Sequence, residues 1–246
     1  MSKSIFIISY FEGREKKYLK KLINQLMKID CQIGVVINDD KVKKIFFEKI
    51  DNIFYLTRKN IGMNIGAWDA GYKYFDNYEN YFFFQDECFI KNYSFFEHYL
   101  YFLSQKNAGI IGDSMNTKWS ETWEKMFSSP LNYSININKQ KIDRVSYYKK
   151  QIEDWDIPIS ETPIHLRSLN IALKKKILDK INGFNIGFFR EQCVAAEIAI
   201  SKKIESLNLQ IAQSHQKPFY FIGHEEWNYN NKKQLNQINF AFEKKR

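Results

Sequence analysis

The chain has 246 residues, of which 44% are hydrophobic and 26% are charged, so it is long enough for one large domain with a sizeable core. This composition excludes a disordered chain. The 37 Lys and Arg residues outnumber the 28 Asp and Glu residues and give a net charge of +9, which favours an anionic partner such as a nucleotide diphosphate, a nucleic acid or a lipid headgroup.

The cysteines and the apolar runs indicate where the protein works. Cys31, Cys88 and Cys193 are too few and too scattered for a disulfide framework or a zinc cluster, which favours a reducing compartment. Residues 1–10 lack the long apolar stretch and the cleavage site of a secretory signal. We also find no run of about 18 apolar residues that would span a membrane. We therefore expect a cytoplasmic protein.

The N-terminal part of the chain alternates between two hydrophobic patterns. Residues 5–10 form a nearly continuous apolar run, which is typical of a strand buried on both faces. In residues 18–27 apolar side chains recur at intervals of three and four, which predicts an amphipathic helix. Residues 32–37 form a second buried strand. A strand, a helix and a strand with short joints predict a right-handed βαβ unit that begins an open α/β sheet.

The same patterns continue through the first half of the chain. We predict further strands over residues 52–56, 81–84 and 109–112, and helices over residues 68–75 and 98–103. In open α/β sheets, ligands bind beyond the carboxyl ends of the strands. The polar residues that follow the first four strands are therefore predicted to converge on one crevice.

The second half of the chain is less regular. Residues 116–163 have weak periodicity, and we predict that they form an irregular insertion that covers the crevice. Residues 171–181 are predicted to form a Lys-rich helix that ends at the stop signal Asn182-Gly183. Another helix is predicted over residues 193–207. In that helix we expect Val194, Ile198 and Ile204 to face the core and Lys202, Lys203 and Glu205 to face solvent.

These elements predict a single domain over residues 1–246, the last part of which is a basic tail. The tail, residues 228–246, carries Lys232, Lys233, Lys244, Lys245 and Arg246. A solvated end is the simpler interpretation of such a charge run, and a binding arm is the alternative.

Two acids end the most aromatic of the predicted strands. Residues 81–84 run into Gln85, Asp86 and Glu87, at the expected carboxyl edge of the sheet. Two neighbouring carboxylates repel each other unless a positive charge lies near them, and Mg²⁺ or Mn²⁺ can supply it together with substrate phosphate. The alternative is a turn with two solvated acids.

A glycine-containing turn follows the third predicted strand. Gly62 and Gly66 allow a positive φ or a close backbone approach, and a helix that begins there would point its amides at an anion. Arg58 and Lys59 add positive charge. The G-x-G-x-x-G dinucleotide fingerprint is absent, and a purely structural turn is the alternative.

Taken together, these segments resemble a known superfamily. The runs IISYF, VVINDD, RKNIGMNIGAWDAGYKYF and YFFFQDE are similar to the nucleotide-sugar-binding half of GT-A fold glycosyltransferases. Among these, the chain resembles family 2-type enzymes and the rhamnan synthesis protein F type of bacterial polysaccharide assembly. That type has an N-x-G-x-D-x-x-A-W segment before an apolar strand that ends in N-D-S. The equivalent positions here are Asn60, Gly62, Asn64, Ala67 and Trp68, then Gln85, Asp86 and Glu87.

The resemblance spans about residues 5–210 and implies a GT-A, Rossmann-like fold, α/β with an open, mostly parallel sheet flanked by helices. It implies a nucleotide-sugar-binding half over residues 1–115 and an acceptor-side half over residues 116–227. The donor-binding residues that it implies are Ser9, Tyr10, Asp39, Asp40, Arg58, Asn60, Gly62, Asn64, Gly66 and Trp68.

The resemblance also implies that Asp86 and Glu87 hold a divalent cation, Mn²⁺ or Mg²⁺, at the D-x-D position. Two departures bear on this. The second acid, Glu87, is directly adjacent to the first rather than one residue further on, and Asn64 replaces the Asp of the rhamnan-type motif.

The second half of the chain supplies the candidate base and the acceptor-side residues. Glu197 matches the second acid of the family 2 E-D pair, and Ala196 stands where the first would be. Inverting transfer needs a carboxylate to take the proton of the acceptor hydroxyl. Glu197 is the first candidate and Glu191 the second, although either can be a solvated helix acid. His165 and Ser168 resemble the H-L-x-S segment on the acceptor side.

Two late segments could hold the metal or the diphosphate. His215 and Lys217 are similar to the late His and Lys-Pro pair of some retaining GT-A enzymes, in which His ligates Mn²⁺ and Lys neutralises the diphosphate. His224 offers another imidazole beside Glu225 and Glu226. In an aromatic-rich segment, each His can instead be a hydrogen-bonded packing residue.

The resemblance thus implies a metal-assisted glycosyltransferase, with a hexosyl or deoxyhexosyl donor and a hydroxyl acceptor on a bacterial surface glycan. A GT-A-like module that binds nucleotide or glycan without catalysis is the alternative, because Gln85-Asp86-Glu87 is atypical. We expect no nucleic-acid partner, because the basic residues are dispersed and no such motif occurs. A lipid-linked acceptor would place the protein at the inner face of the plasma membrane, where the Lys-rich segments favour peripheral contact with anionic lipid.

Overall fold

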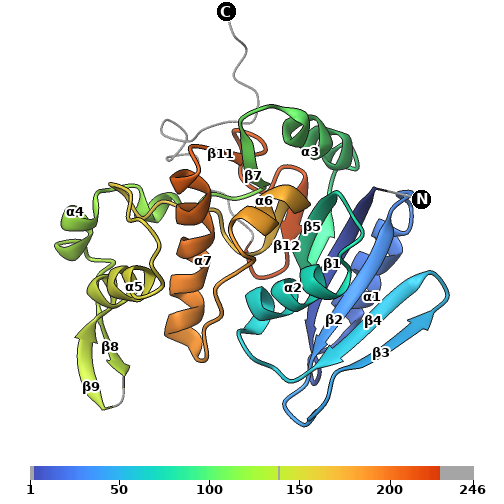
Figure 1. Ribbon diagram of the computed structural model, residues 1–246, viewed down its shortest axis with the longest axis horizontal. Coiled ribbons are helices and arrows are strands. Elements are labelled where there is room, and N and C mark those ends of the chain that lie inside the picture. The colour runs from blue at the N-terminus through green and yellow to red at the C-terminus, as the bar shows by residue number, and fades with distance from the viewer. Residues whose placement is uncertain (1–2, 138, 228–246) are drawn as a thin grey trace, which may run out of the picture.

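The computed structural model describes residues 3–137 and 139–227. Its centre is an eight-stranded sheet with the order β11-β7-β10-β5-β1-β2-β4-β3 (Figure 1). The strands of this sheet are β1 (Ser4–Phe11), β2 (Gln32–Asn38), β3 (Phe46–Ile50), β4 (Ile53–Arg58), β5 (Asn80–Gln85), β7 (Ala108–Gly112), β10 (Asn170–Lys174) and β11 (Gln210–Gln213).

Six of these strands run in the same direction. β1 is parallel to β2 and to β5, β2 is parallel to β4, and β11 is parallel to β7. β10 is antiparallel to both of its neighbours, and β3 is antiparallel to β4. The open, mostly parallel sheet that the sequence predicts is therefore confirmed.

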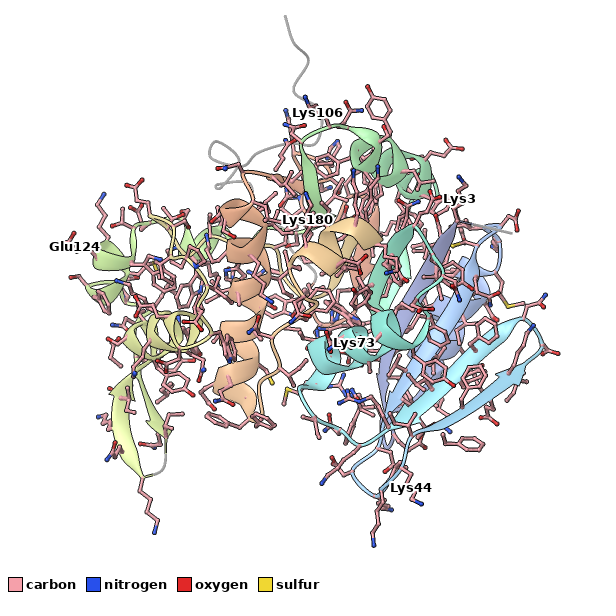
Figure 2. All side chains as sticks on the ribbon, in the orientation of Figure 1. Lys3, Lys44, Lys73, Lys106, Glu124 and Lys180 are labelled. Carbon is pink, nitrogen blue, oxygen red and sulfur yellow. The ribbon has the colours of Figure 1, made fainter. Side chains whose placement is uncertain are left out.

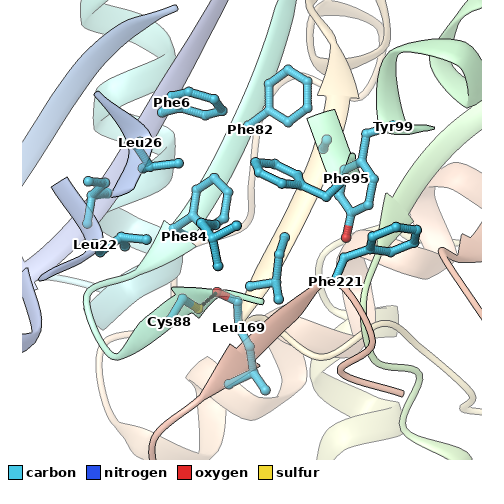
Figure 3. Packing of buried hydrophobic residues seen from close by; sticks show 14 of the residues in the cluster. Phe6, Leu22, Leu26, Phe82, Phe84, Cys88, Phe95, Tyr99, Leu169 and Phe221 are labelled. Carbon is cyan, nitrogen blue, oxygen red and sulfur yellow. Dashed lines mark hydrogen bonds between the residues drawn. The ribbon is translucent and has the colours of Figure 1, made fainter. Parts of the chain in front are cut away.

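Helices cover both faces of the sheet. They are α1 (Lys16–Leu26), α2 (Met63–Tyr74), α3 (Phe95–Ser104), α4 (Trp123–Phe127), α5 (Arg144–Glu153), α6 (Lys175–Lys180) and α7 (Arg190–Ser206). Side chains of α1 and α3 pack on one face, against Phe6, Phe82 and Phe84 (Figure 3). Side chains of α2, α6 and α7 pack on the other face, against Ile7 and Phe83. Because successive strand residues point to opposite faces, the continuous apolar runs supply both clusters.

One predicted helix is wrong in its first half. Residues 171–181 do not form a single helix, because Asn170–Lys174 is strand β10, inserted between β5 and β7. Ile171, Ala172 and Leu173 are all buried, as expected of a strand that pairs on both sides and is covered on both faces. The stop signal holds, since Asn182 and Gly183 have φ values of 53° and 65° after α6.

The insertion at residues 116–163 is more ordered than predicted. It contains α4, α5 and a hairpin of β8 (Ser134–Ile137) and β9 (Gln140–Asp143). Trp119, Trp123 and Tyr148 pack with Ala195 and Ile198 of α7 in a third hydrophobic cluster. The insertion therefore packs beside α7, on the side away from β1 to β4 (Figure 1).

Two lysines of α7 do not face solvent as predicted. Lys202 is fully buried, and its ammonium donates to the Ser160 hydroxyl, the Thr162 carbonyl and the Glu205 carboxylate. The Lys203 ammonium donates to the carbonyls of Ile181 and Gly183. The long side chains reach polar groups of neighbouring segments, which satisfies charges that periodicity alone would place outside.

Short strands complete the described structure. β6 (Cys88–Ile90) follows β5 directly and pairs with β12 (Ile222–His224), which brings the end of the described chain beside Asp86 and Glu87. β6, β11 and β12 were not predicted, because each has only three or four residues. β3 was not predicted either, because its residues FFEKI are all exposed and do not alternate between apolar and polar. The predicted basic tail, residues 228–246, lies outside the described residues. No helix in the described ranges is long and apolar enough to cross a membrane.

Candidate functional site

A cavity of about 480 Å³ opens at the carboxyl ends of β1, β2 and β5, beside the turn between β4 and α2. This is the edge at which the sequence predicts a crevice. The residues that line it are Ser9, Tyr10, Phe11, Arg14, Asn38, Asn60, Met63, Asn64, Gln85 and Asp86.

Asp86 is the acidic residue of this lining. It is 5% exposed, and its Oδ2 is buried without a hydrogen-bond partner among the described residues. Burial and the charge of Glu87 raise the pKa of Asp86 to about 6. A buried carboxylate oxygen that accepts no hydrogen bond is costly, so it marks a place where a ligand can bind.

Glu87 points to different partners. Its Oε2 accepts a hydrogen bond from Arg14 at 2.8 Å and lies 3.8 Å from Nε2 of His224. Its side chain is 12% exposed and is not part of the cavity lining. The adjacent acids therefore separate in the turn between β5 and β6, Asp86 toward the cavity and Glu87 toward Arg14.

Arg14 is the cationic residue of the lining, and the sequence analysis missed it. It lies in the turn between β1 and α1, where Gly13 has a φ of 107°. The Tyr10 hydroxyl donates to the Arg14 carbonyl at 2.7 Å, and the Arg14 amide donates to the Phe11 carbonyl. The backbone at Arg14 is thus fixed. Glu87 uses one of the five N–H groups of the guanidinium, which leaves the others available to an anion in the cavity.

The residues fit a divalent cation only with help from a substrate. In the described ranges, no three side chains of His, Cys, Asp or Glu form a group that could hold a metal ion. Mg²⁺ is nevertheless commonly held by one or two carboxylates together with phosphate oxygens and water. The unpartnered Oδ2 of Asp86 suits this arrangement, with Asp86 as the protein ligand.

The structure does not support either His as a ligand. Nδ1 of His224 accepts from the Glu226 amide, and its Nε2 donates to Oε1 of Gln85 at 3.2 Å, so both nitrogens are engaged. Burial lowers the pKa of His224 to about 4. His215 stacks on Tyr220, and Lys217 lines a separate cavity together with Lys91 and Tyr93. His215 and Lys217 therefore do not join Asp86.

The turn between β4 and α2 forms one wall of the cavity. The Arg58 guanidinium donates to Oδ1 of Asn38 and to the Ile61 carbonyl, so it holds the turn closed instead of facing the cavity. Gly62 has a φ of 78°, and a Cβ on Gly66 would collide with the Ile61 carbonyl. These residues place Asn60 and Asn64 in the lining.

Three other predicted donor contacts lie elsewhere. Trp68 is fully buried, and its Nε1 donates to the Phe84 carbonyl, because the second turn of α2 faces the sheet. Asp39 and Asp40 are outside the cavity lining, and Oδ1 of Asp39 accepts from the Lys41 amide. Asn38, one residue earlier, lines the cavity instead. Ser9 and Tyr10 line it as the resemblance implies.

Ser168 connects the cavity to α7. Its carbonyl accepts from the side-chain amides of Asn64 and Gln85, each at 2.7 Å. Its amide donates to Oε2 of Glu197 at 2.9 Å, and its hydroxyl donates to the same oxygen. Ser168 thus lies directly behind two residues of the lining.

Glu197 is held by hydrogen bonds and lies outside the cavity lining. Its Oε1 is 3.1 Å from Nε2 of His165, whose Nδ1 donates to the Pro163 carbonyl. Burial alone would raise the pKa of Glu197, but the bonds from His165 and Ser168 outweigh burial and lower the pKa to about 2. A carboxylate with such a low pKa is a poor proton acceptor at neutral pH. The structure therefore argues against Glu197 as the base.

A comparison with solved structures supports the fold. No protein-family model and no curated protein sequence matches the chain. A mannosyltransferase from Pyrobaculum calidifontis, solved with GDP-Man and Mn²⁺, matches with a TM-score of 0.50 at 9% identity over 85% of this chain. The chain spans only 53% of that protein.

Two further matches are more distant. A Drosophila β-1,4-galactosyltransferase 7 mutant, solved with manganese, UDP-Gal and xylobiose, has a TM-score of 0.43 at 11% identity, over 96% of this chain and 76% of that one. TarS from S. aureus has a TM-score of 0.42 at 14% identity, over 81% and 55%. The GT-A, Rossmann-like fold that the sequence predicts is thus confirmed by the sheet and the mannosyltransferase match.

Proposed function

We propose that this chain is a metal-assisted glycosyltransferase that moves a sugar from a nucleotide-diphosphate donor to a hydroxyl group. The observation that carries the proposal is the cavity at the carboxyl edge of the sheet, in which the unpartnered Oδ2 of Asp86 lies near the guanidinium of Arg14. The Asp86 carboxylate can bind a cation and the Arg14 guanidinium can bind a phosphate oxygen, so together they suit a diphosphate leaving group.

Within this proposal, each charged residue has one task. Asp86 would hold the divalent cation, which would supply positive charge beside the diphosphate leaving group. Arg14 binds a phosphate oxygen directly, and Glu87 orients Arg14 through the 2.8 Å bond. Asn60, Asn64 and the ends of β1 and β2 shape the pocket around the rest of the donor.

Glu191 is the proposed base. Like Glu197 it lies outside the cavity lining, in the first turn of α7, where its charge acts on Tyr147 and Tyr148. The segment before it contacts the turn between β4 and α2, since a Cβ on Gly62 would lie 2.7 Å from Cγ2 of Ile186. Glu197 instead positions Ser168, and through it Asn64 and Gln85. His165 and Ser168 then act on the acceptor side through their hydrogen bonds to Glu197.

The resemblance to the rhamnan synthesis protein F type supports the finer parts of the proposal. We propose a hexosyl or deoxyhexosyl donor and an acceptor on a bacterial surface glycan of the capsule, lipopolysaccharide or O-antigen kind. The net charge of +9 supports work at the anionic cytoplasmic face of a membrane, where a lipid-linked acceptor is presented.

Calorimetry with a panel of nucleoside diphosphates and their sugars, with and without Mn²⁺, tests the proposal. We expect one nucleotide to bind, more tightly with Mn²⁺ than without, and its sugar to be released or transferred on incubation. Binding without turnover across the panel would favour the inactive module. No binding by any member would contradict both the glycosyltransferase and a nucleotide-binding module.

A further inference from the structure

The edge strand β3 exposes large apolar side chains. All five of its residues are exposed, including Phe46 at 57%, Phe47 at 39% and Ile50 at 51%, and Ile45 just before it is 64% exposed. β3 ends the sheet next to β4, and over residues 3–137 and 139–227 no strand pairs with its outer edge (Figure 1). An apolar edge of this kind is a template for pairing with another strand.

The hairpin determines which backbone groups are free. Ile50 pairs with Ile53 across the two-residue loop Asp51-Asn52, in which Asp51 has a φ of 53°. The residues that flank such a loop share both of their hydrogen bonds, and the pattern then alternates along the strand. Phe46 and Glu48 therefore direct their backbone groups to β4, whereas Ile45 and Phe47 direct theirs outward.

We propose that β3 pairs with β3 of a second copy of this chain, antiparallel across a twofold axis, so that the two sheets become continuous. In the pairing that fits best, Phe46 lies opposite Phe46 of the second copy. Ile45 of each copy then lies opposite Phe47 of the other copy, and each of these two pairs is joined by the backbone hydrogen-bonding groups that point outward. Lys44 and Glu48 face each other twice as opposite charges.

Charge and shape select this register. Moving the centre of the pairing from Phe46 to Phe47 would place Phe46 opposite Glu48, and moving it to Glu48 would place two carboxylates opposite each other. Like charges that face each other across strands are destabilising, and aromatic or opposite-charge pairs are stabilising. The pairing ends at Lys44 because the chain bends at this residue. Lys44 is labelled at the lower edge of the molecule in Figure 2.

The contact closes as a dimer and does not extend into a fibre. The other edge of the sheet is β11, in which Ala212 and Gln213 are fully buried, so that edge cannot receive β3 of another copy. A contact that uses the same patch on both copies is closed by its own symmetry. Because only a few residues pair, the interface is smaller than the roughly 1,200 Å² of stable complexes, and the dimer is weak and concentration-dependent.

Sedimentation velocity of the full chain over a wide concentration range tests the proposal. We expect a reversible shift from monomer to dimer, which Phe46→Lys abolishes. Phe127→Lys is the matched control, because Phe127 is 40% exposed on α4, and it should dimerise like the wild type. A wild type that stays monomeric would overturn the proposal, as would a Phe46→Lys variant that still dimerises.

A charge swap tests the register. Lys44→Glu and Glu48→Lys should each weaken the dimer about tenfold, and the double variant should recover because it restores both opposite-charge pairs. Lys106→Glu, at an exposed lysine far along the chain, is the control for net charge. A double variant that dimerises no better than the singles would overturn this pairing. So would a monomeric wild type that binds phosphatidylserine vesicles through Phe46, because the exposed strand would then serve a membrane.

Discussion

Oδ2 of Asp86 is buried without a hydrogen-bond partner among the described residues, whereas Oε2 of its neighbour Glu87 accepts a bond from Arg14 at 2.8 Å. An unsatisfied buried oxygen costs about 1–3 kcal/mol, which a fold retains where the oxygen serves a ligand. At the scale of single residues, the proposed function therefore gives the two acids separate tasks, Asp86 toward the cavity and Glu87 toward Arg14.

Asp86→Asn tests the first task. The amide keeps the shape of the side chain but removes the charge that holds a cation, so we expect turnover to fall at least about a hundredfold, as when one electrostatic stabiliser is lost. Calorimetry should show that Mn²⁺ no longer strengthens nucleotide binding. An unchanged rate in a variant with an unaltered circular dichroism spectrum would contradict the role of Asp86.

Arg14→Gln tests whether Arg14, which Glu87 orients, binds phosphate. Removing a charge-assisted bond to phosphate should weaken nucleoside diphosphate binding at least about tenfold, both with and without Mn²⁺. Lys16→Gln is the control, because Lys16 lies in the same region and is exposed in an ion pair with Glu12. If both variants lost the same binding affinity, Arg14 would act only through the overall electrostatic field of the protein and not through a direct bond to phosphate.

At the scale of elements, the turn between β4 and α2 shapes the cavity by backbone geometry. Gly62 adopts a positive φ, and Gly66 lets the first turn of α2 approach the Ile61 carbonyl. Arg58 then fastens the turn to Asn38 at the end of β2. The glycines are thus needed for close approach, and Asn60 and Asn64 reach the cavity because of them.

Gly66→Ala should therefore disturb both stability and binding. The added Cβ collides with backbone and cannot be relieved by a rotamer change, so we expect a loss of about 2–4 kcal/mol in the free energy of unfolding. Urea denaturation measures this loss, and calorimetry should show weaker nucleotide binding. Ala70→Ser in the same helix is the control. A Gly66→Ala variant as stable as the control would contradict this account of the turn.

At the scale of the whole molecule, α7 joins the insertion to the sheet. Its buried side chains contribute both to the cluster on the face of the sheet and to the cluster inside the insertion. Glu197 lies between these clusters and bonds His165 and Ser168. Because Glu197 bonds residues at the contact between these two clusters, its protonation should affect the stability of the whole fold.

The stability of the protein should accordingly depend on acid through Glu197. Its pKa is lowered from 4.5 to about 2, so its ionised form stabilises the fold above pH 4.5 and this stabilisation is lost as the pH falls toward 2. We expect Glu197→Gln to lower the free energy of unfolding at pH 7 by up to about 3 kcal/mol. Denaturation of both proteins at several pH values should show this difference shrinking below pH 4.5. A difference that is constant from pH 7 to pH 3 would contradict the assignment.

The sequence by itself determined the elements with strong patterns. The apolar runs of β1, β2, β4 and β5 and the spacing in α1 are local signals, and the acids after β5 mark a strand end whatever its neighbours are. These features suffice for an open α/β sheet with a site at its carboxyl edge. These strand patterns also predict that Asp86 and the glycine-containing turn lie at the same edge of the sheet, because parallel strands bring their carboxyl ends together.

Only the tertiary structure decided what depends on partners distant in the chain. β10 is a strand because it fills the space between β5 and β7, although its residues continue into a helix. Arg14 lines the cavity because the turn after β1 places it beside the end of β5, where Glu87 binds its guanidinium. Glu197 does not line the cavity, and its carboxylate bonds His165 and Ser168 instead. A side chain's pKa and direction are set by the groups packed against it, and local sequence does not contain that information.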